Sequence, residues 1–343
     1  MKKLLNVLYV TQSDTYLALD GENVLVKKGD DQLIRVPLHN LEGIVTFGYT
    51  GTSPALMYAC ASRDIDLSFL TANGRFLARV SGEIRGNVLL RHKQHQVYDN
   101  LVESLVIAKN MVAGKVFNSR WVIERTLRDH EMRVDSSLLR SVSESLKQTL
   151  SNIFECNNLE QLRGLEGNAA ERYFQTFNEM VLHNRDFFVF NTRNRRPPLD
   201  PINALLSFVY TLLAREAANA LETVGLDSYI GFLHRARPGR ISLALDLMEE
   251  LRPVCADRFV LTLINRKELG IDSFETRENG AVFLRDEARQ KVLRAWQTRK
   301  QETITHPFLN EKIAWGLVPH AQALLLARYL RGDLDEYPPF MWK

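Results

Sequence analysis

The sequence predicts an α+β fold, with a small β-rich N-terminal domain over residues 1–86 and a larger all-α C-terminal domain over residues 87–343. In the first part, Asp-Gly and Asn-Gly pairs separate short apolar runs, which is a strong hairpin signal. After residue 86, apolar residues recur at the spacing of a helix. A chain of 343 residues also exceeds what one hydrophobic core usually holds, so two domains are expected.

Alternating strands and turns account for most of the first domain. The apolar N-terminal run ends at Thr11 without a small-residue cleavage site, so we expect a first strand rather than a signal peptide. Ser53 is a good N-cap and Pro54 suits a first helical turn, so a short helix begins there. Hairpin turns are expected at Asp20-Gly21 and Asn73-Gly74. The expected strands are residues 4–10, 16–19, 24–27, 33–37, 42–46, 67–70 and 76–80.

Long helices are expected from residue 87 to about residue 330. Proline-containing breakers at 196–198, 237–239 and 252–253 divide this stretch. The apolar face of its first long helix is marked by Leu101, Leu105, Ala108, Val112 and Val116.

Composition limits the class of protein but does not name its partner. The formal charge of +3 is small against 44 basic and 41 acidic residues, so a nucleic-acid surface must come from local clustering. The three cysteines are far apart and odd in number, which argues against a disulfide framework or a structural zinc site and fits a reducing compartment. No apolar run is long enough to span a bilayer, so we expect a soluble, cytoplasmic protein without a membrane partner.

The first segment with chemical potential runs from Arg163 to Phe174. Glu166 and Tyr173 are seven residues apart and share one helical face. Small residues, among them Gly164 and Gly167, surround the carboxylate and let a backbone or a ligand come close. The alternative is ordinary helix packing with a solvated glutamate.

The second segment is a stiff, basic, proline-rich loop that enters a helix. Asp200 can cap this helix, with Pro201 at its first position. Asn203, Ser207 and Tyr210 then form a polar stripe inside an apolar helix. Buried polar groups need partners, so the stripe is either a seam between helices or the wall of an active site.

The third segment carries a histidine, four arginines and an acidic pair. Asp246 and Glu249 are three residues apart on one helix and face the same side. Such a pair repels unless a cation or water screens it, and His234 can fold back over it from the preceding loop. The alternative is a surface helix with ordinary ion pairs. The arginines are Arg235, Arg237, Arg240 and Arg252.

Together the segments offer Glu166, His234 and Glu249 or Asp246 as ligands for a hard divalent ion, Mg²⁺ or Mn²⁺. Such an ion can stabilise charge on a phosphodiester during an in-line displacement, and nearby arginines can hold phosphates. The chain has no phosphate-binding Gly-x-x-x-x-Gly-Lys-Ser/Thr run and no Gly-x-Ser-x-Gly elbow.

These three segments, in this order, resemble the integrase that inserts new spacers into CRISPR arrays, the larger, catalytic protein of the CRISPR adaptation module. The resemblance covers nearly the whole chain and is carried by Leu-Glu-Gly-x-Ala-Ala around Glu166, Pro-Ile-Asn-Ala-Leu-Leu-Ser at 201–207, and Ser-Leu-Ala-Leu-Asp-Leu-Met-Glu at 242–249 after His234. It implies metal binding by Glu166, His234 and Glu249. It implies a ligand-orienting or proton-carrying role for Asp246. Glu250 follows Glu249 directly, so the third ligand stays open between the two, with spacing in favour of Glu249.

The resemblance also implies a reaction and partners. DNA 3′-hydroxyls attack the repeat backbone by direct transesterification, and water in their place makes the same site a nuclease. The protein would form a homodimer through its β-domain and bind a small ferredoxin-like companion protein.

DNA contact is expected from the polar and basic residues outside the ligand set, with phosphates the more frequent target. For each basic cluster, a solvated face is the alternative. The expected contacts are Tyr173, Arg193, Arg195, Arg196, Asn203, Ser207, Arg235, Arg237, Arg240, Arg252, Arg285 and Arg289. The competing functions are a metal-dependent nuclease that never joins strands and a DNA-binding scaffold without catalysis.

Overall fold

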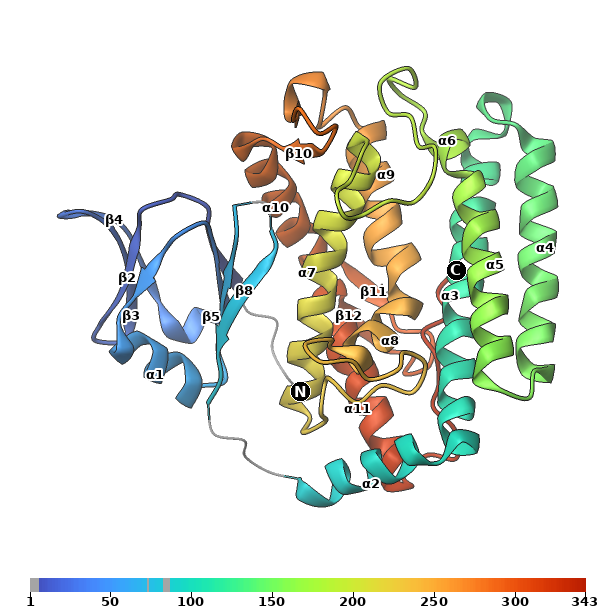
Figure 1. The fold of residues 1–343 in the computed structure, drawn as a ribbon, viewed down its shortest axis with the longest axis horizontal. Coiled ribbons are helices and arrows are strands. Elements are labelled where there is room, and N and C mark those ends of the chain that lie inside the picture. The colour runs from blue at the N-terminus through green and yellow to red at the C-terminus, as the bar shows by residue number, and fades with distance from the viewer. Residues whose placement is uncertain (1–5, 73, 83–86) are drawn as a thin grey trace. The chain divides into compact units, whose positions relative to one another are not determined.

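The computed structural model of the chain describes residues 6–72, 74–82 and 87–343 (Figure 1). The chain divides into two compact units, one of Met1–Gly86 with Arg285–Glu302 and the other of Asn87–Leu284 with Thr303–Lys343. A strand-rich part is followed by a mostly helical part, which confirms the predicted fold class.

Two four-stranded sheets build the first unit. The hairpin predicted at Asp20-Gly21 is present, and Gly21 adopts the positive φ of 57° that such a turn requires. Gly74 also has a positive φ, of 82°, while Asn73 and the first residues of the predicted strand 4–10 lie outside the described residues. One sheet has the order β1 (Asn6–Val10), β5 (Leu41–Phe47), β7 (Asp66–Leu70), β8 (Phe76–Val80), and the other has the order β4 (Asp31–Pro37), β3 (Asn23–Lys28), β2 (Tyr16–Asp20), β6 (Gly51–Thr52).

Strands that are neighbours in the first sheet are mostly not neighbours in the sequence. β5 pairs in parallel with both β1 and β7, and only β7–β8 in this sheet is an antiparallel hairpin. Helix α1 (Pro54–Ser62) connects the sheets, and Ser53 caps it as predicted, its Oγ accepting the Leu56 amide at 3.3 Å. Leu17, Ile44 and Leu67 form the centre of the apolar core of this unit.

Helix α10 (Asp286–Gln301) belongs to the first unit although the sequence assigned it to the helical domain. Its buried Lys300 pairs with Glu42 at 2.9 Å. Arg289 is also buried, donates to the Ala72 carbonyl and lies over the Phe47 ring at 5.5 Å. The prediction that Arg289 contacts DNA is therefore wrong, because the guanidinium is committed to the interior of this unit.

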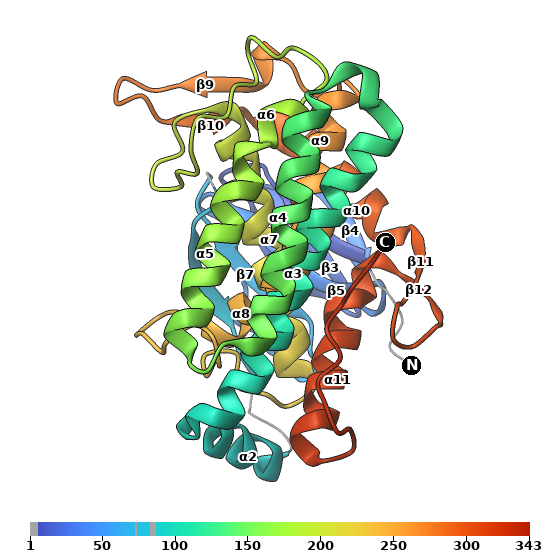
Figure 2. The same cartoon turned by 90° about the vertical axis from the view of Figure 1, so that its right-hand side faces the viewer.

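The second unit is built around the 30-residue helix α3 (Leu101–His130). Helices α4 and α5 pack along α3, and the three lie side by side in Figure 2. The predicted all-α domain also contains two short hairpins, β9 (Phe274–Thr276) with β10 (Val282–Leu284) and β11 (Thr303–Thr305) with β12 (Lys312–Ala314). The other helices are α2 (Val88–Asp99), α4 (Ser136–Glu155), α5 (Leu159–Gln175), α6 (Phe177–Met180), α7 (Pro201–Thr223), α8 (Ser242–Leu251), α9 (Arg258–Asn265) and α11 (Val318–Arg331).

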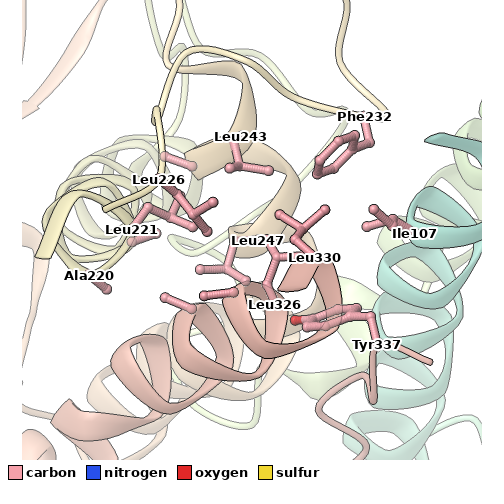
Figure 3. Close-up of a cluster of buried hydrophobic side chains, with 14 of the residues drawn as sticks. Ile107, Ala220, Leu221, Leu226, Phe232, Leu243, Leu247, Leu326, Leu330 and Tyr337 are labelled. Atoms are coloured by element: carbon pink, nitrogen blue, oxygen red, sulfur yellow. The ribbon is translucent and has the colours of Figure 1, made fainter. Parts of the chain in front are cut away.

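Helix α8 is anchored by an apolar cluster shown in Figure 3. Leu243 and Leu247 of α8 pack in this cluster with Leu221 of α7 and with Leu326 and Leu330 of α11. A π-helical turn, Arg252–Asp257, joins α8 to α9, a distortion that is frequent at functional sites. The apolar side of α8 packs in this cluster, and Asp246 and Glu249 of the same helix belong to the site described below.

Among the described residues, no helix combines the length and apolar character that a membrane span requires.

Two leucines of helix α11 give a matched test of this core. Leu326 is fully buried, whereas Leu324 on the same helix is 43% exposed. Leu326→Ala should lower the free energy of unfolding by about 2–5 kcal/mol because it leaves a cavity, and Leu324→Ala should change it by less than about 0.5 kcal/mol. Urea unfolding followed by circular dichroism measures both, and similar losses for the two variants would contradict this packing.

Candidate metal and nucleic-acid site

Helix α5 presents Glu166 at an open part of the helical unit. Its side chain is 25% exposed. A Cβ added at Gly164 or Gly167 would meet no described atom within 4 Å. These two glycines therefore leave room beside the carboxylate and do not serve close helix packing, which was the alternative explanation.

Helix α8 presents Asp246, which holds the loop that carries His234. The buried carboxylate accepts the backbone N–H groups of Phe232 at 2.6 Å, Leu233 at 2.9 Å and His234 at 3.0 Å. A Cβ at Gly231 would come within 2.6 Å of Asp246 Oδ2, so glycine is needed for this close approach. The backbone N–H groups of this loop are therefore satisfied by one carboxylate and not by a helix or a sheet.

Asp246 also fixes the orientation of the His234 ring. The Nδ1 of His234 lies 2.5 Å from Asp246 Oδ1. A carboxylate can only accept hydrogen bonds, so Nδ1 carries the hydrogen and Nε2 is the nitrogen left to bind a metal or a proton. A histidine oriented by a carboxylate in this way is the usual arrangement of a metal ligand.

Glu249 is one turn beyond Asp246 and is only 4% exposed. Lys115 Nζ lies 2.7 Å from its Oε2 and Arg252 lies 2.8 Å from its Oε1. Burial acts to raise its pKa, but Arg252, Lys115 and the nearby His234 outweigh burial and hold the pKa at about 2. Glu249 is therefore a carboxylate anion at neutral pH.

Lys115, on helix α3, was not identified from the sequence. Its ammonium pairs with both Glu166 and Glu249. Burial acts to lower its pKa, but the Glu249 and Glu166 carboxylates raise it, so the side chain stays charged. A signal was present, since Lys115 follows the fully buried Met111 by four residues on an apolar helical face.

Glu250 points away from this cluster. It is fully buried, and its carboxylate accepts hydrogen bonds from the Phe340 amide at 2.9 Å, the Gln322 amide at 2.9 Å and the Tyr337 hydroxyl. Burial raises its pKa to about 7 in spite of these bonds. The geometry therefore favours Glu249, and not Glu250, as the partner of Glu166.

Glu166, His234 and Glu249 fit a divalent ion by their chemistry. Two carboxylates and one imidazole nitrogen form a mixed O/N donor set suited to Mg²⁺ or Mn²⁺, and a cation, Lys115, already lies between the carboxylates. Their side chains are not gathered around one point, since no three His, Cys, Asp or Glu in the described ranges come close enough to hold a metal. The donors are present, and closure around an ion requires side-chain movement.

Arg252 was predicted to contact DNA, but its contacts lie inside the protein. Besides its pair with Glu249, its guanidinium lies 4.6 Å over the Tyr210 ring. Tyr210 in turn donates to Asp257 at 2.5 Å. Tyr173, also predicted to contact DNA, is 2% exposed and packs on Phe177. Both predictions of DNA contact are therefore wrong, because Arg252 and Tyr173 are occupied by contacts inside the protein. Arg252 instead holds Glu249 through its ion pair.

The polar stripe of helix α7 is a seam that holds the basic loop. Asn203 is fully buried and accepts from Arg193 at 2.6 Å and from the Asn194 amide at 3.2 Å. Ser207 accepts from Arg193 at 3.2 Å. Asp200 caps the helix as predicted, accepting the Asn203 amide at 2.8 Å. Asn203 is therefore not a DNA contact, and Arg193 is held mainly by the protein.

Exposed arginines lie on the proline-rich loop before α7 and on the loop that carries His234. Arg195, Arg196 and Arg237 are exposed. Burial lowers the pKa of Arg240, and the cations Arg237, Arg195 and Arg163 lower it further while Asp246 opposes the shift. Arg240 therefore has positive charge from both loops around it. Such a group suits binding of phosphates. Arg235 is exposed and pairs with Glu160 at 2.7 Å, and Arg285 is exposed on the other unit.

Comparison with known proteins gives matches over the whole chain. Residues 8–298 match the family described as "CRISPR associated protein Cas1". The CRISPR-associated endonuclease Cas1 1 of Chlorobaculum tepidum is 46% identical over 343 residues, which is all of both chains. The solved Cas6-RT-Cas1–Cas2 complex shares the fold with a TM-score of 0.84 and 23% identity, over 100% of this chain and 36% of that one. A casposase bound to integration product also shares it, with a TM-score of 0.84 and 21% identity, over 99% of this chain and 95% of that one.

The raised pKa of Glu250 predicts a pH dependence of stability. Because its folded-state pKa of about 7 is above its usual 4.5, the folded protein binds this proton more tightly than the unfolded chain does. The resulting stabilisation is complete below pH 4.5 and is lost as the pH rises through 7. Between pH 5 and pH 7.5, the wild type should lose about 2 kcal/mol more unfolding free energy than Glu250→Gln.

Urea unfolding at the two pH values measures this difference. Glu250→Gln lowers stability by itself, so the comparison rests on the change with pH and not on the absolute values. Equal pH dependence in the two proteins would show that Glu250 does not titrate in this range.

Proposed function

Because the chain belongs to the Cas1 family of CRISPR-associated proteins, we propose that it is a divalent-metal-dependent enzyme that joins DNA 3′-hydroxyl ends to a CRISPR repeat and can cut DNA at the same site. The observation that carries this proposal is that Lys115 pairs with both Glu166 and Glu249, and that His234 is near enough to Glu249 to help lower the pKa of that carboxyl. Exposed arginines lie on the neighbouring loops. The name of the Chlorobaculum relative, an endonuclease, supports the cutting part of this proposal.

The joining reaction balances without ATP or a covalent enzyme intermediate. The 3′-oxygen of the incoming DNA forms a new bond to a target phosphorus while the bond from that phosphorus to its own 3′-oxygen breaks. The incoming hydroxyl loses one proton and the leaving oxygen gains one. With water as the nucleophile, the same displacement is hydrolysis, which explains cutting and joining by one site.

The residues of the chain divide these tasks. Glu166, Glu249 and Nε2 of His234 would hold Mg²⁺ or Mn²⁺, which when bound supplies charge stabilisation at the phosphorus. Asp246 orients His234 through the 2.5 Å contact to Nδ1. Arg195, Arg237 and Arg240 would hold phosphates of the DNA.

Partners follow from the same proposal. In the first unit, Leu33 and Ile34 of β4 and Phe76 and Leu77 of β8 are more than 40% exposed. Apolar side chains on sheet surfaces suit a homodimer interface through this unit. A small ferredoxin-like companion protein fits the solved assembly that contains Cas1 and Cas2. Because the proposed reaction acts on cellular DNA, the proposal includes a cytoplasmic location.

A nuclease that never joins strands is the second candidate, and the word endonuclease in the name of the Chlorobaculum relative favours it. Its site chemistry is the same, so only the product distinguishes the two functions. A scaffold without catalysis is disfavoured because it needs neither a charged Glu249 nor an oriented His234.

Strand transfer tests the proposed function directly. The protein and its companion are given short duplexes with free 3′-hydroxyls, a supercoiled plasmid carrying a repeat, and Mn²⁺ or Mg²⁺. Glu166→Ala and His234→Ala should each reduce the joined product by about 100-fold or more. Glu171→Ala is the control, since Glu171 is an exposed carboxylate on the same helix α5.

The products on a gel separate the alternatives. Nicked plasmid without joined product supports the nuclease, and full activity of both alanine variants would mean that the metal site is elsewhere or absent.

DNA affinity without metal tests the arginine surface. Arg195→Ala and Arg237→Ala should weaken binding of a short duplex, and each lost phosphate contact should reduce the slope of log affinity against log salt by about 1. Fluorescence anisotropy over a salt series measures both. Arg140, which is exposed on α4 and paired with Glu131, is the control, and equal weakening by Arg140→Ala would assign the effect to net charge alone.

A further inference from the structure

One buried ammonium forms ion pairs with both carboxylates of the proposed metal site. Lys115 lies in the middle of α3, and its side chain is 8% exposed. It is bonded to Glu166 Oε1, and it lies 2.7 Å from Glu249 Oε2. The other oxygen of Glu249 pairs with Arg252 at 2.8 Å. Among the described residues, Lys115 is the one cation that pairs with both carboxylates.

The charges of the surrounding side chains explain why a cation lies at this position. Glu166 and Glu249 supply two negative charges, and Lys115 and Arg252 supply two positive charges, so the buried group is neutral as it stands. Removing the ammonium would leave two like charges close together, one of them on the buried Glu249, where water screens charge poorly. Adding a divalent ion beside the ammonium would instead leave an excess of two positive charges. The oxygens that Lys115 occupies are also those that a metal needs.

We propose that Lys115 is a positioning residue that holds Glu166 and Glu249 together while no metal is bound, and that it gives up these ion pairs when a divalent cation binds. The proposal rests on the proposed function, because it takes the two glutamates as metal ligands. It also explains why the proposed ligands are not gathered around one point among the described residues, because the ammonium lies between the two glutamates. Lys115 then competes with the metal, and it keeps the two carboxylates from repelling each other apart while the site is empty.

Lys115→Met is the direct test, because methionine keeps much of the apolar length of the lysine and removes its charge. In metal-free protein, this variant should melt several degrees lower than the wild type. Mn²⁺ should raise its melting temperature more than that of the wild type. Because no ammonium has to be displaced, the Kd for Mn²⁺ measured by calorimetry should fall about tenfold.

Lys147→Met is the matched control. Lys147 is an exposed lysine on α4 that pairs with Glu144 at 3.2 Å. Its loss removes the same charge from an ion pair that water already screens. The melting temperature and the Mn²⁺ affinity of this variant should match those of the wild type.

A double-mutant cycle separates charge from packing. Glu166→Gln removes one of the two repelling carboxylates. Metal-free Lys115→Met/Glu166→Gln should therefore melt higher than Lys115→Met alone. If the loss in Lys115→Met reflects only poor packing of methionine, Glu166→Gln will not relieve it, and that result would overturn the proposal.

The outcome is read without DNA or catalysis, so it is separable from the outcome for the proposed function. Unchanged or weaker Mn²⁺ binding in Lys115→Met overturns the competition, and so does a wild type that binds no Mn²⁺. A wild type that shows the expected Mn²⁺ behaviour but yields no joined product in the strand-transfer assay leaves this inference in place and contradicts the proposed function.

Discussion

The ion pairs of Lys115 with Glu166 and Glu249 are the constraint around which the candidate site is arranged. They connect the middle of α3 to α5 and α8, elements whose sequences are far apart. Buried charges stabilise a fold only when their partners are accurately placed, because each has lost its hydration. The close packing of α3 against α5 and α8 meets that requirement, and the apolar cluster behind α8 keeps the acidic side of that helix directed at Lys115.

Two adjacent glutamates show how strongly surroundings determine chemistry. Glu249 has two cationic partners and a pKa of about 2, whereas Glu250 has uncharged donors and a pKa of about 7. Both are buried on the same helix, one residue apart. The first is suited to bind a metal. The second attaches α8 to the C-terminal segment through Tyr337 and Phe340, so it contributes to the position of its neighbour.

Several polar residues near the site support it instead of binding a ligand. Asn203 holds Arg193, Asp246 holds His234, and Arg252 holds Glu249. The site is thus surrounded by side chains whose hydrogen bonds are directed at the residues that would bind ligand, as precise positioning requires. Exposure separates the two groups, because Arg195 and Arg237 face water while these supports do not.

Local sequence determined the fold class, the hairpin at Asp20-Gly21, the helix caps at Ser53 and Asp200, and the three segments of the candidate site. Each of these depends on residues a few positions apart, and periodicity and turn chemistry report such short distances. Only the tertiary structure decided that α10 packs with the sheets, that Tyr173 is buried, and that Lys115 joins the two glutamates. These depend on which distant segments pack together. The place of Lys115 on an apolar helical face indicates burial, but it does not indicate which distant carboxylates the ammonium contacts.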